Sequence, residues 1–191
     1  SQRGGGGGPR RGGDAEAELT ISLADAANRA TKRVTLTDAE GTNRTLDVKV
    51  PPGITDGATI RLTGQGGPGR EGGVAGDLLL HLRIAPDPRF RVDAADPFTL
   101  ITTVPIAPWE AALGAKVHVP TIDSEVVLTI PAGTSSGQRL RVRGHGLPRK
   151  SGDRADLIAE ARIVVPPTIE PEVRALYERL AAESNFDPRA A

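Results

Sequence analysis

The chain has 191 residues, of which 38% are hydrophobic and 25% are charged, but only 3% are aromatic. This composition allows a packed core made mainly of valine, isoleucine, leucine and alanine. The 24 basic and 24 acidic residues balance, which removes any bulk electrostatic reason to expect nucleic acid or an anionic membrane as the main partner.

Cysteine is absent from the chain. Its absence excludes disulfide bonds, thiolate zinc sites and cysteine nucleophiles. No apolar run approaches the ~18 residues of a membrane span, and residues 1–13 lack the apolar core of a signal peptide. We therefore expect a cytoplasmic protein, and the start at Ser1 is compatible with a fragment of a longer chain.

The first 13 residues, SQRGGGGGPRRGG, contain no apolar side chain that a core would bury. Burial does not offset the entropy of ordering such a glycine-rich stretch. We predict that residues 1–13 form a flexible linker rich in glycine and arginine.

The first half of the chain after this linker has the pattern of short β-strands. Apolar and polar residues alternate over 17–23, 34–36, 46–50, 60–62 and 78–84, which is typical of half-buried strands. An alanine-rich helical turn is expected over 24–29. Pro51, Pro52 and Gly53 predict a sharp turn after the third strand.

The second half repeats this order, with strands expected over 100–106, 116–119, 125–130, 140–142 and 157–165 and a short helix over 109–113. We expect antiparallel pairing in both halves. After Pro166 and Pro167 the apolar spacing becomes i, i+3, i+4, i+7, which predicts a helix with one apolar face. That face comprises Val173, Leu176, Tyr177 and Leu180.

The two halves are related by an internal duplication. The segment VPPGITDGATIRLTGQG at 50–66 recurs as IPAGTSSGQRLRVRGHG at 130–146, with its prolines, glycines and one arginine in matching places. We predict a mainly β fold of two tandem β-sandwich-like domains with a short C-terminal helix. The expected domains cover residues 14–92 and 93–166, followed by the helix and tail at 167–191.

A dinucleotide-binding loop is one alternative for the repeated segment. Gly64, Gly66 and Gly69 satisfy the G-x-G-x-x-G pattern after an expected strand. Residues 70–76 are too rich in glycine to begin the helix that such a loop requires, and the second copy has Arg149 at the place of the third glycine. The glycines are therefore interpreted as turn residues.

No group of residues predicts catalysis or metal binding. The three histidines are far apart without metal-ligand spacing, and no Gly-x-Ser-x-Gly elbow is present. We expect no enzyme activity, no metal and no cofactor. Trp109 opens an Ala/Leu segment, so we expect it to anchor the core.

Several segments together resemble the C-terminal substrate-binding region of DnaJ co-chaperones, in the zinc-free class that includes bacterial curved-DNA-binding proteins. They are GGDAEAELTISLADAANRATKRVTL, VKVPPGITDGATIRLTGQG, GDLLLHLRIAPDPRF and VPIAPWEAALGAKVHVPTIDSEVVLTIPAGTSSGQRLRVRGHGLP. The resemblance runs from about Gly12 to Tyr177. It implies a substrate-binding fragment that lacks the J domain and holds non-native polypeptides for delivery to a DnaK-type chaperone.

The resemblance also implies site residues. A shallow groove on the first domain would hold an apolar client segment, which adds as a strand to the edge near Val34 to Leu36. Lys32 matches a position that binds the acidic tail of the partner chaperone, whereas Thr35 departs from that pattern. The apolar face of the C-terminal helix, Val173, Leu176, Tyr177 and Leu180, would form a homodimer. The client-binding positions are Ala17, Leu19, Val34, Leu36 and Phe90.

Other interpretations remain open. From the residues alone, the apolar alternation is explained more simply by core packing. A protein that binds DNA through Arg10 and Arg11 is the competing functional class, and a structural β-sandwich without a client is a third. The duplication, with Leu19 aligned to Thr102 and Phe90 to Ile169, predicts the groove in the first half only.

Overall fold

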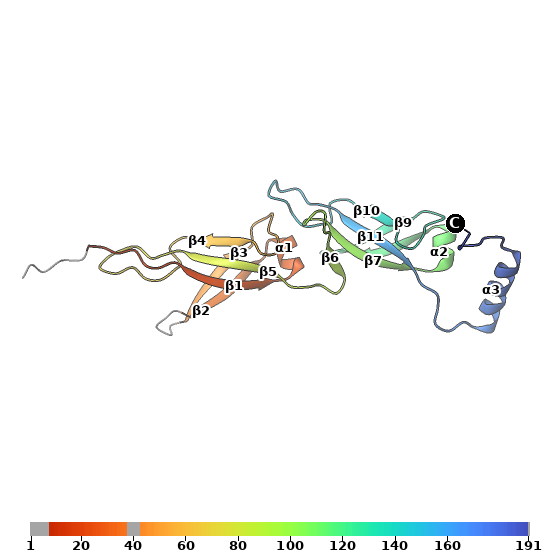
Figure 1. Cartoon of the computed structure of the whole chain (residues 1–191), viewed down its shortest axis with the longest axis horizontal. Helices are drawn as coiled ribbons and strands as arrows, with labels where there is room; N and C mark the ends of the chain where they lie inside the picture. Colours follow the sequence, from red (N-terminus) through yellow and green to blue (C-terminus); the bar gives the residue numbers. More distant parts are fainter. Residues whose placement is uncertain (1–7, 38–42, 191) are drawn as a thin grey trace, which may run out of the picture.

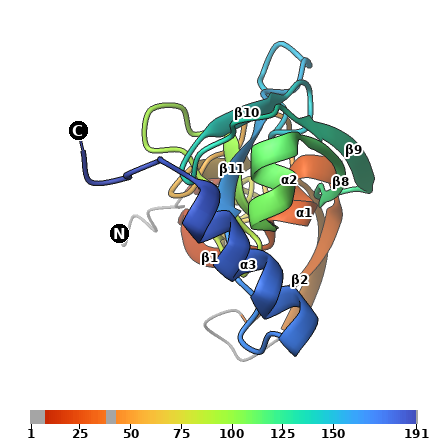
Figure 2. The same ribbon diagram turned by 90° about the vertical axis from the view of Figure 1, so that its right-hand side faces the viewer.

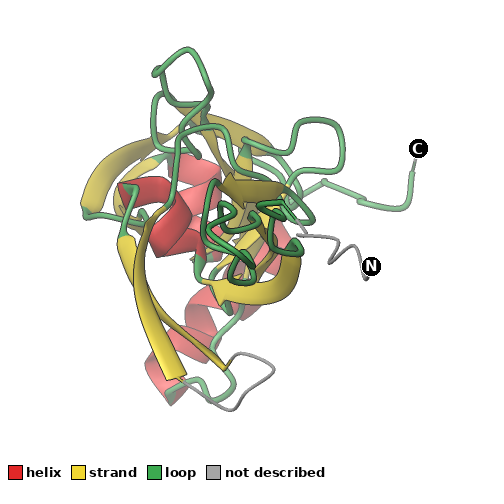
Figure 3. Ribbon diagram, turned by 90° about the vertical axis from the view of Figure 1, so that its left-hand side faces the viewer, coloured by secondary structure: helices red, strands yellow, loops and turns green. Residues whose placement is uncertain are grey.

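The computed structural model describes residues 8–37 and 43–190. The molecule is elongated, with the first β unit at one end, the second in the middle and the C-terminal helix at the far end (Figure 1). The fold is mainly β, as predicted, and strands dominate the view along the long axis (Figure 3).

The first unit contains two small sheets. One has the strand order β1-β5-β4 and the other pairs β2 with β3. Both cover an apolar cluster formed by Val48, Leu78 and Leu80. The elements are β1 (Ala15–Ile21), α1 (Leu23–Asn28), β2 (Thr31–Thr37), β3 (Asn43–Lys49), β4 (Thr59–Leu62) and β5 (Leu78–Ile84).

The second unit repeats this plan with one additional strand. Its sheets have the order β10-β11-β7-β6 and β8-β9. The elements are β6 (Phe90–Val92), β7 (Leu100–Ile106), α2 (Pro108–Leu113), β8 (Ala115–Pro120), β9 (Glu125–Ile130), β10 (Arg139–Val142), β11 (Leu157–Ile163) and the C-terminal α3 (Pro171–Glu183). The predicted duplication and the C-terminal helix are therefore both present.

The prediction of purely antiparallel pairing is wrong. β1 runs parallel to β5, and β7 runs parallel to β11. An early strand of each unit, β1 or its equivalent β7, therefore joins the last strand of that unit, a long-range pairing that alternation alone does not reveal. The other strand pairs are antiparallel: the hairpins β2–β3 and β8–β9, and the pairs β4–β5, β10–β11 and β6–β7.

The strand register also corrects the equivalence of positions between the copies. Ala15 pairs with Leu78 and Leu100 pairs with Leu157, so Ala17 corresponds to Thr102 and Leu19 corresponds to Val104. The sequence-based alignment of Leu19 with Thr102 is therefore wrong by two positions, because Ala17 is the residue equivalent to Thr102. The hairpin connections of the two copies differ in length, so one sequence offset does not serve the whole chain.

A single apolar cluster joins the two units. Ile21, Leu23 and Leu82 of the first unit lie in the same cluster as Leu100 and Leu157 of the second. A backbone hydrogen bond from Gly53 N–H to the Pro148 carbonyl (2.9 Å) also connects them. β6 pairs with β7, so strand pairing assigns residues 90–92 to the second sheet although the expected boundary placed them in the first domain.

The C-terminal helix α3 lies across the end of the molecule beside α2 (Figure 2). None of its residues is buried. Among the described residues, no helix combines the length and apolar character needed to cross a membrane.

Candidate functional site

A half-buried apolar surface lies between β1 and β2. Ala17 and Leu19 alternate with exposed residues on β1, and Val34 and Leu36 do so on β2. All four pack against the buried cluster of the first unit. The core-packing interpretation thus holds for part of each side chain, while the remaining part is open to solvent.

Phe90 lies apart from Ala17, Val34 and Leu36, in a cluster against which Leu19 also packs. It is only 3% exposed and belongs to the cluster between the two units. Its strand β6 pairs with β7, which places Phe90 opposite Thr102 in the second sheet. Strand pairing thus places the Phe90 backbone in the second sheet, and the assignment of its side chain to the client groove stays a prediction.

The outer edge of β2 carries backbone groups that are not used by β3. Val50 N–H donates to the Ala30 carbonyl (3.0 Å), and the antiparallel register pairs Val34 with Leu46. Because hydrogen-bonded and non-bonded pairs alternate, the backbone groups of Arg33 and Thr35 point toward the open edge. Within residues 8–37 and 43–190, β2 has no strand partner other than β3.

Lys32 lies at the start of this surface and already has an acidic partner. Its Nζ lies 2.8 Å from Asp25 Oδ2, and its side chain is 36% exposed. Asp25 is also the third residue of helix α1, where its carboxylate accepts from the backbone N–H of Ser22 in a capping box. Burial opposes ionisation of Asp25, but hydrogen bonds from Lys32 and Ser22 outweigh that effect and lower the pKa of this carboxyl.

The repeated glycine-rich segment holds an aspartate in each unit. Asp77 Oδ1 accepts from Gly64 N–H (2.9 Å), and Asp77 Oδ2 accepts from Arg61 Nε (2.7 Å). Gly64 has a φ of 69°, a conformation that glycine adopts without strain. The backbone bond from Gly64 and the pairing with Arg61 hold the pKa of Asp77 below its usual value.

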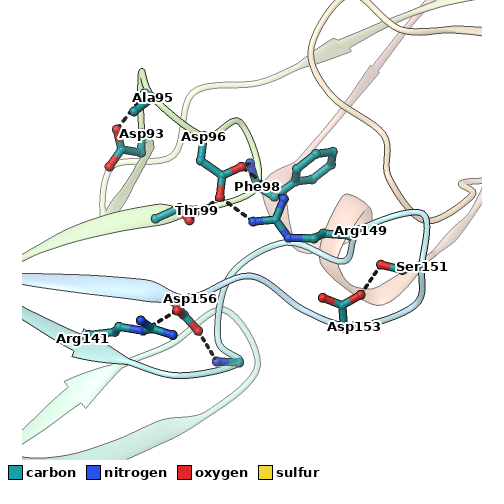
Figure 4. Close-up of polar contacts among 11 residues, drawn as sticks. Asp93, Ala95, Asp96, Phe98, Thr99, Arg141, Arg149, Ser151, Asp153 and Asp156 are labelled. Atoms are coloured by element: carbon teal, nitrogen blue, oxygen red, sulfur yellow. Dashed lines mark hydrogen bonds and ion pairs between the residues drawn. The ribbon is translucent and has the colours of Figure 1, made fainter.

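The second copy repeats this arrangement with Asp156, Gly144 and Arg141. Figure 4 shows Arg141 directed at Asp156, close to the loop in which Arg149 pairs with Asp96 (2.6 Å). The repeated segment is therefore a scaffold that fixes its turns to the start of the last strand.

An apolar pocket lies between α2 and α3. Its volume is about 360 Å³, and Trp109 and Leu176 in its wall are 51% and 65% exposed. The expectation that Trp109 anchors the core is wrong, because α2 presents this side chain toward α3. The pocket contains the four expected dimerisation residues, and sequence reasoning missed Trp109 and Leu113. The lining residues are Pro108, Trp109, Ala112, Leu113, Val173, Leu176, Tyr177 and Leu180.

The polar residues with potential for other chemistry are dispersed. In the part of the chain that the structure describes, no group of three or more metal-binding side chains occurs. His81 lies beside Glu16 (3.4 Å), and His118 beside Glu125 (2.7 Å). Arg11, one of the two arginines assigned to DNA binding, forms ion pairs with Asp14 (3.2 Å) and Asp77 (3.1 Å).

Comparison with known proteins gives a consistent family. The family model described as the DnaJ C terminal domain matches residues 15–166. A "Curved DNA-binding protein" of Pseudomonas putida (strain GB-1) is 48% identical over 190 residues, which cover 95% of this chain and 59% of the relative. One from Escherichia fergusonii is 52% identical over 147 residues, covering 76% of this chain and 47% of the relative. The chain thus spans about three fifths or less of the length of these relatives.

Proposed function

Because this chain belongs to the DnaJ C-terminal domain family, we propose that it binds exposed apolar segments of non-native polypeptides and presents them to a DnaK-type chaperone. The binding surface is the groove between β1 and β2, and no chemical step is involved. The comparison of the two copies carries this proposal.

The two copies differ in the exposure of equivalent positions. Val34 and Leu36 are half-buried, whereas the positions that the strand register matches to them, Val119 and Thr121, are 0% and 2% exposed. Ala17 is likewise half-buried, whereas its equivalent Thr102 is 3% exposed. The first unit thus keeps open a surface that the second unit closes, which supports a client site in the first unit.

A client segment would add to the open edge of β2. The backbone groups of Arg33 and Thr35 would pair with the client backbone, and alternate client side chains would enter the groove beside Val34 and Leu36. Backbone hydrogen bonds do not depend on the side chains of the client, so the site would bind client segments of many different sequences.

The affinity follows from two opposing free energies. Burial of a leucine-sized side chain contributes about 1.5 to 3 kcal/mol, whereas association costs at least ~4 kcal/mol. Two or three such side chains leave at most about 5 kcal/mol, less than the about 8 kcal/mol of micromolar binding, so we expect weak and permissive binding. Such binding suits a protein that must release its client.

Lys32 is the proposed contact for the acidic tail of the partner chaperone. Its ammonium group is partly exposed but paired with Asp25, so an acidic tail must compete with that carboxylate. We therefore expect the tail to bind weakly and with a strong dependence on salt.

The apolar pocket between α2 and α3 supports the proposal that the chain forms a homodimer. Leu176 and Leu180 are 65% and 61% exposed, and an unpaired apolar surface of this kind marks an interface. The apolar face of α3 in a second copy of the chain would be complementary to this surface. Two weak client sites in one dimer would then bind one polypeptide with higher avidity.

The relatives named curved DNA-binding proteins favour DNA binding as a second candidate function. Arg10 and Arg11 are the described basic residues of the linker, although Arg11 is engaged by two carboxylates. A salt-dependent shift of a duplex containing A-tracts in a native gel, lost in the Arg10→Ala/Arg11→Ala variant, would support it. An unchanged shift in that variant would exclude the linker as the contact.

The direct test of the client-binding proposal is suppression of aggregation of guanidine-denatured citrate synthase. We expect the wild-type chain to suppress aggregation and Leu36→Asp to lose most of that effect, since a charge in the groove opposes apolar burial. Thr121→Val, at the closed position in the second unit, is the matched control. Equal suppression by a folded Leu36→Asp variant would refute the proposal.

A further inference from the structure

In the second unit, the strand equivalent to β1 is β7, and its outer edge is covered by β6. β6 pairs antiparallel with β7, with Arg91 opposite Ile101 and Phe90 opposite Thr102. Phe90 enters a buried cluster that also contains Leu100, Leu147 and Leu157. Arg91 stays on the outer face, where its Nη2 lies 3.0 Å from Glu160 Oε2.

The equivalent edge in the first unit is open. β1 is the terminal strand of its sheet within the described residues. The bonds from Ala15 N–H to the Asp77 carbonyl and from Ala85 N–H to the Ile21 carbonyl (both 2.8 Å) fix which residues face β5. The backbone groups of Glu16 and Glu18 therefore point away from the sheet.

A cavity adjoins the start of this edge and extends to Leu36 and Thr37 of β2. It has a volume of about 670 Å³ and is lined in part by Ala15, Gly67 and Leu78. These positions are the equivalents of Leu100, Leu147 and Leu157, which share a cluster with Phe90. The first unit therefore has an open backbone edge on β1 with a cavity at its start, whereas β6 covers the equivalent edge of the second unit.

We propose that the outer edge of β1 is a second strand-binding site, and that its occupant is an extended polypeptide segment in which basic and large apolar residues alternate. In the register of β6 on β7, a residue at the place of Arg91 lies opposite Glu16, and one at the place of Phe90 lies opposite Ala17. The next residue, at the place of Arg89, continues this register to Glu18.

The charges on this edge fit such a segment. The side chains of Glu16 and Glu18 are 69% and 62% exposed, and their neighbours His81 and Arg83 lie at 3.4 and 4.0 Å. Both carboxylates thus remain available to a basic residue on an adjacent strand, and opposite charges directly across a strand pair stabilise it. Ala17 leaves room for a large side chain opposite it, as Thr102 does for Phe90.

The kind of ligand at this site, a segment of a non-native polypeptide, rests on the proposed function. The binding edge is different, because the segment would pair with β1 and not with β2. The β2 edge selects a peptide segment by burial of apolar side chains alone. The β1 edge also prefers a segment with basic residues. Separate proline variants distinguish the two, because proline removes the N–H that an added strand requires and is tolerated on edge strands. Pro105 already occupies such a position on β7.

The experiment uses a fluorescein-labelled peptide with the sequence of residues 88–92, PRFRV, and measures fluorescence anisotropy. We expect Glu16→Pro to weaken binding at least about tenfold through loss of the edge hydrogen bond and the charge. Thr20→Pro is the matched control, because it lies on the same edge beyond the segment that β6 covers and is equivalent to Pro105. It should change the affinity less than about twofold.

A charge exchange gives an independent result that does not depend on proline. The Glu16→Lys/Glu18→Lys variant should prefer a PEFEV peptide over PRFRV, reversing the wild-type order. Absence of PRFRV binding to the wild-type chain would overturn the proposal, as would equal binding by Glu16→Pro or an unreversed preference. Loss of binding in Thr35→Pro alone would place the peptide on β2 instead. The citrate synthase assay reports separately on the proposed function.

Discussion

Lys32 Nζ lies 2.8 Å from Asp25 Oδ2, so the residue proposed to contact a partner's acidic tail is held by the capping box of α1. This pair connects the stability of α1 with the availability of a binding cation. It also fixes the side chain of Lys32 at the start of β2, next to the groove.

Asp25→Asn should destabilise the chain by about 1 to 2 kcal/mol at neutral pH, because it weakens the helix cap and removes the ion pair. The pKa of Asp25 is lowered in the folded chain. Its contribution is therefore present above the unfolded pKa of about 3.9 and is lost as the pH falls through the lower folded pKa. Urea unfolding from pH 7 to pH 3 checks this, and a constant difference between variant and wild type would contradict it.

The same substitution should strengthen binding of an acidic tail. With Asp25→Asn, Lys32 no longer has a competing carboxylate, so an acidic C-terminal peptide should bind a few-fold more tightly at low salt. Lys32→Gln should weaken the same peptide, and Lys116→Gln on β8 of the second unit serves as the control. Titration of a labelled acidic peptide measures all three, and identical affinities would remove Lys32 from the tail site.

Leu176→Asp should convert a dimer of the chain into a monomer, because it places a charge in the apolar pocket between α2 and α3. Ala175→Asp introduces the same charge on the other side of α3 and should leave the dimer intact. Sedimentation equilibrium measures the mass of each variant. A dimer that persists in Leu176→Asp would refute the assignment of this pocket to self-association.

Asp77→Asn should destabilise the chain more than Asp156→Asn. The Asp77 side chain is 4% exposed and contacts Gly64, Arg61 and Arg11, whereas the Asp156 side chain is 23% exposed and contacts Gly144 and Arg141. The pKa of Asp77 is lowered, so its effect should be present at neutral pH and diminish on acidification. Chemical unfolding of both variants gives the two changes in stability. A larger loss in Asp156→Asn would contradict the role given to the burial and additional ion pair of Asp77.

The sequence predicts the duplication because glycines, prolines and an arginine recur in one order. The structure gives the reason for this recurrence: Gly64 and Arg61 hold Asp77, and their equivalents hold Asp156. Alternation likewise predicts the strands, since each sheet has one face on an apolar cluster. Local pattern is sufficient for features that depend on neighbouring residues.

Features that depend on distant pairing were not predictable in this way. Phe90 lies in a strand of three residues, too short for a periodic signal, and only its pairing with Thr102 places it in the second unit. Trp109 sits in a short Ala/Leu helix whose outer face is defined only by the position of α3. The parallel pairing of β1 with β5 joins segments separated by most of the first unit.

The most direct test of the client-binding account is a map of backbone amide shifts on addition of an unlabelled apolar peptide that lacks charge. We expect the largest shifts on Arg33 and Thr35, with methyl shifts at Val34 and Leu36, and we expect Thr35→Pro to abolish them. Shifts confined to the second unit or to α3, or an unchanged map in a folded Thr35→Pro variant, would contradict it.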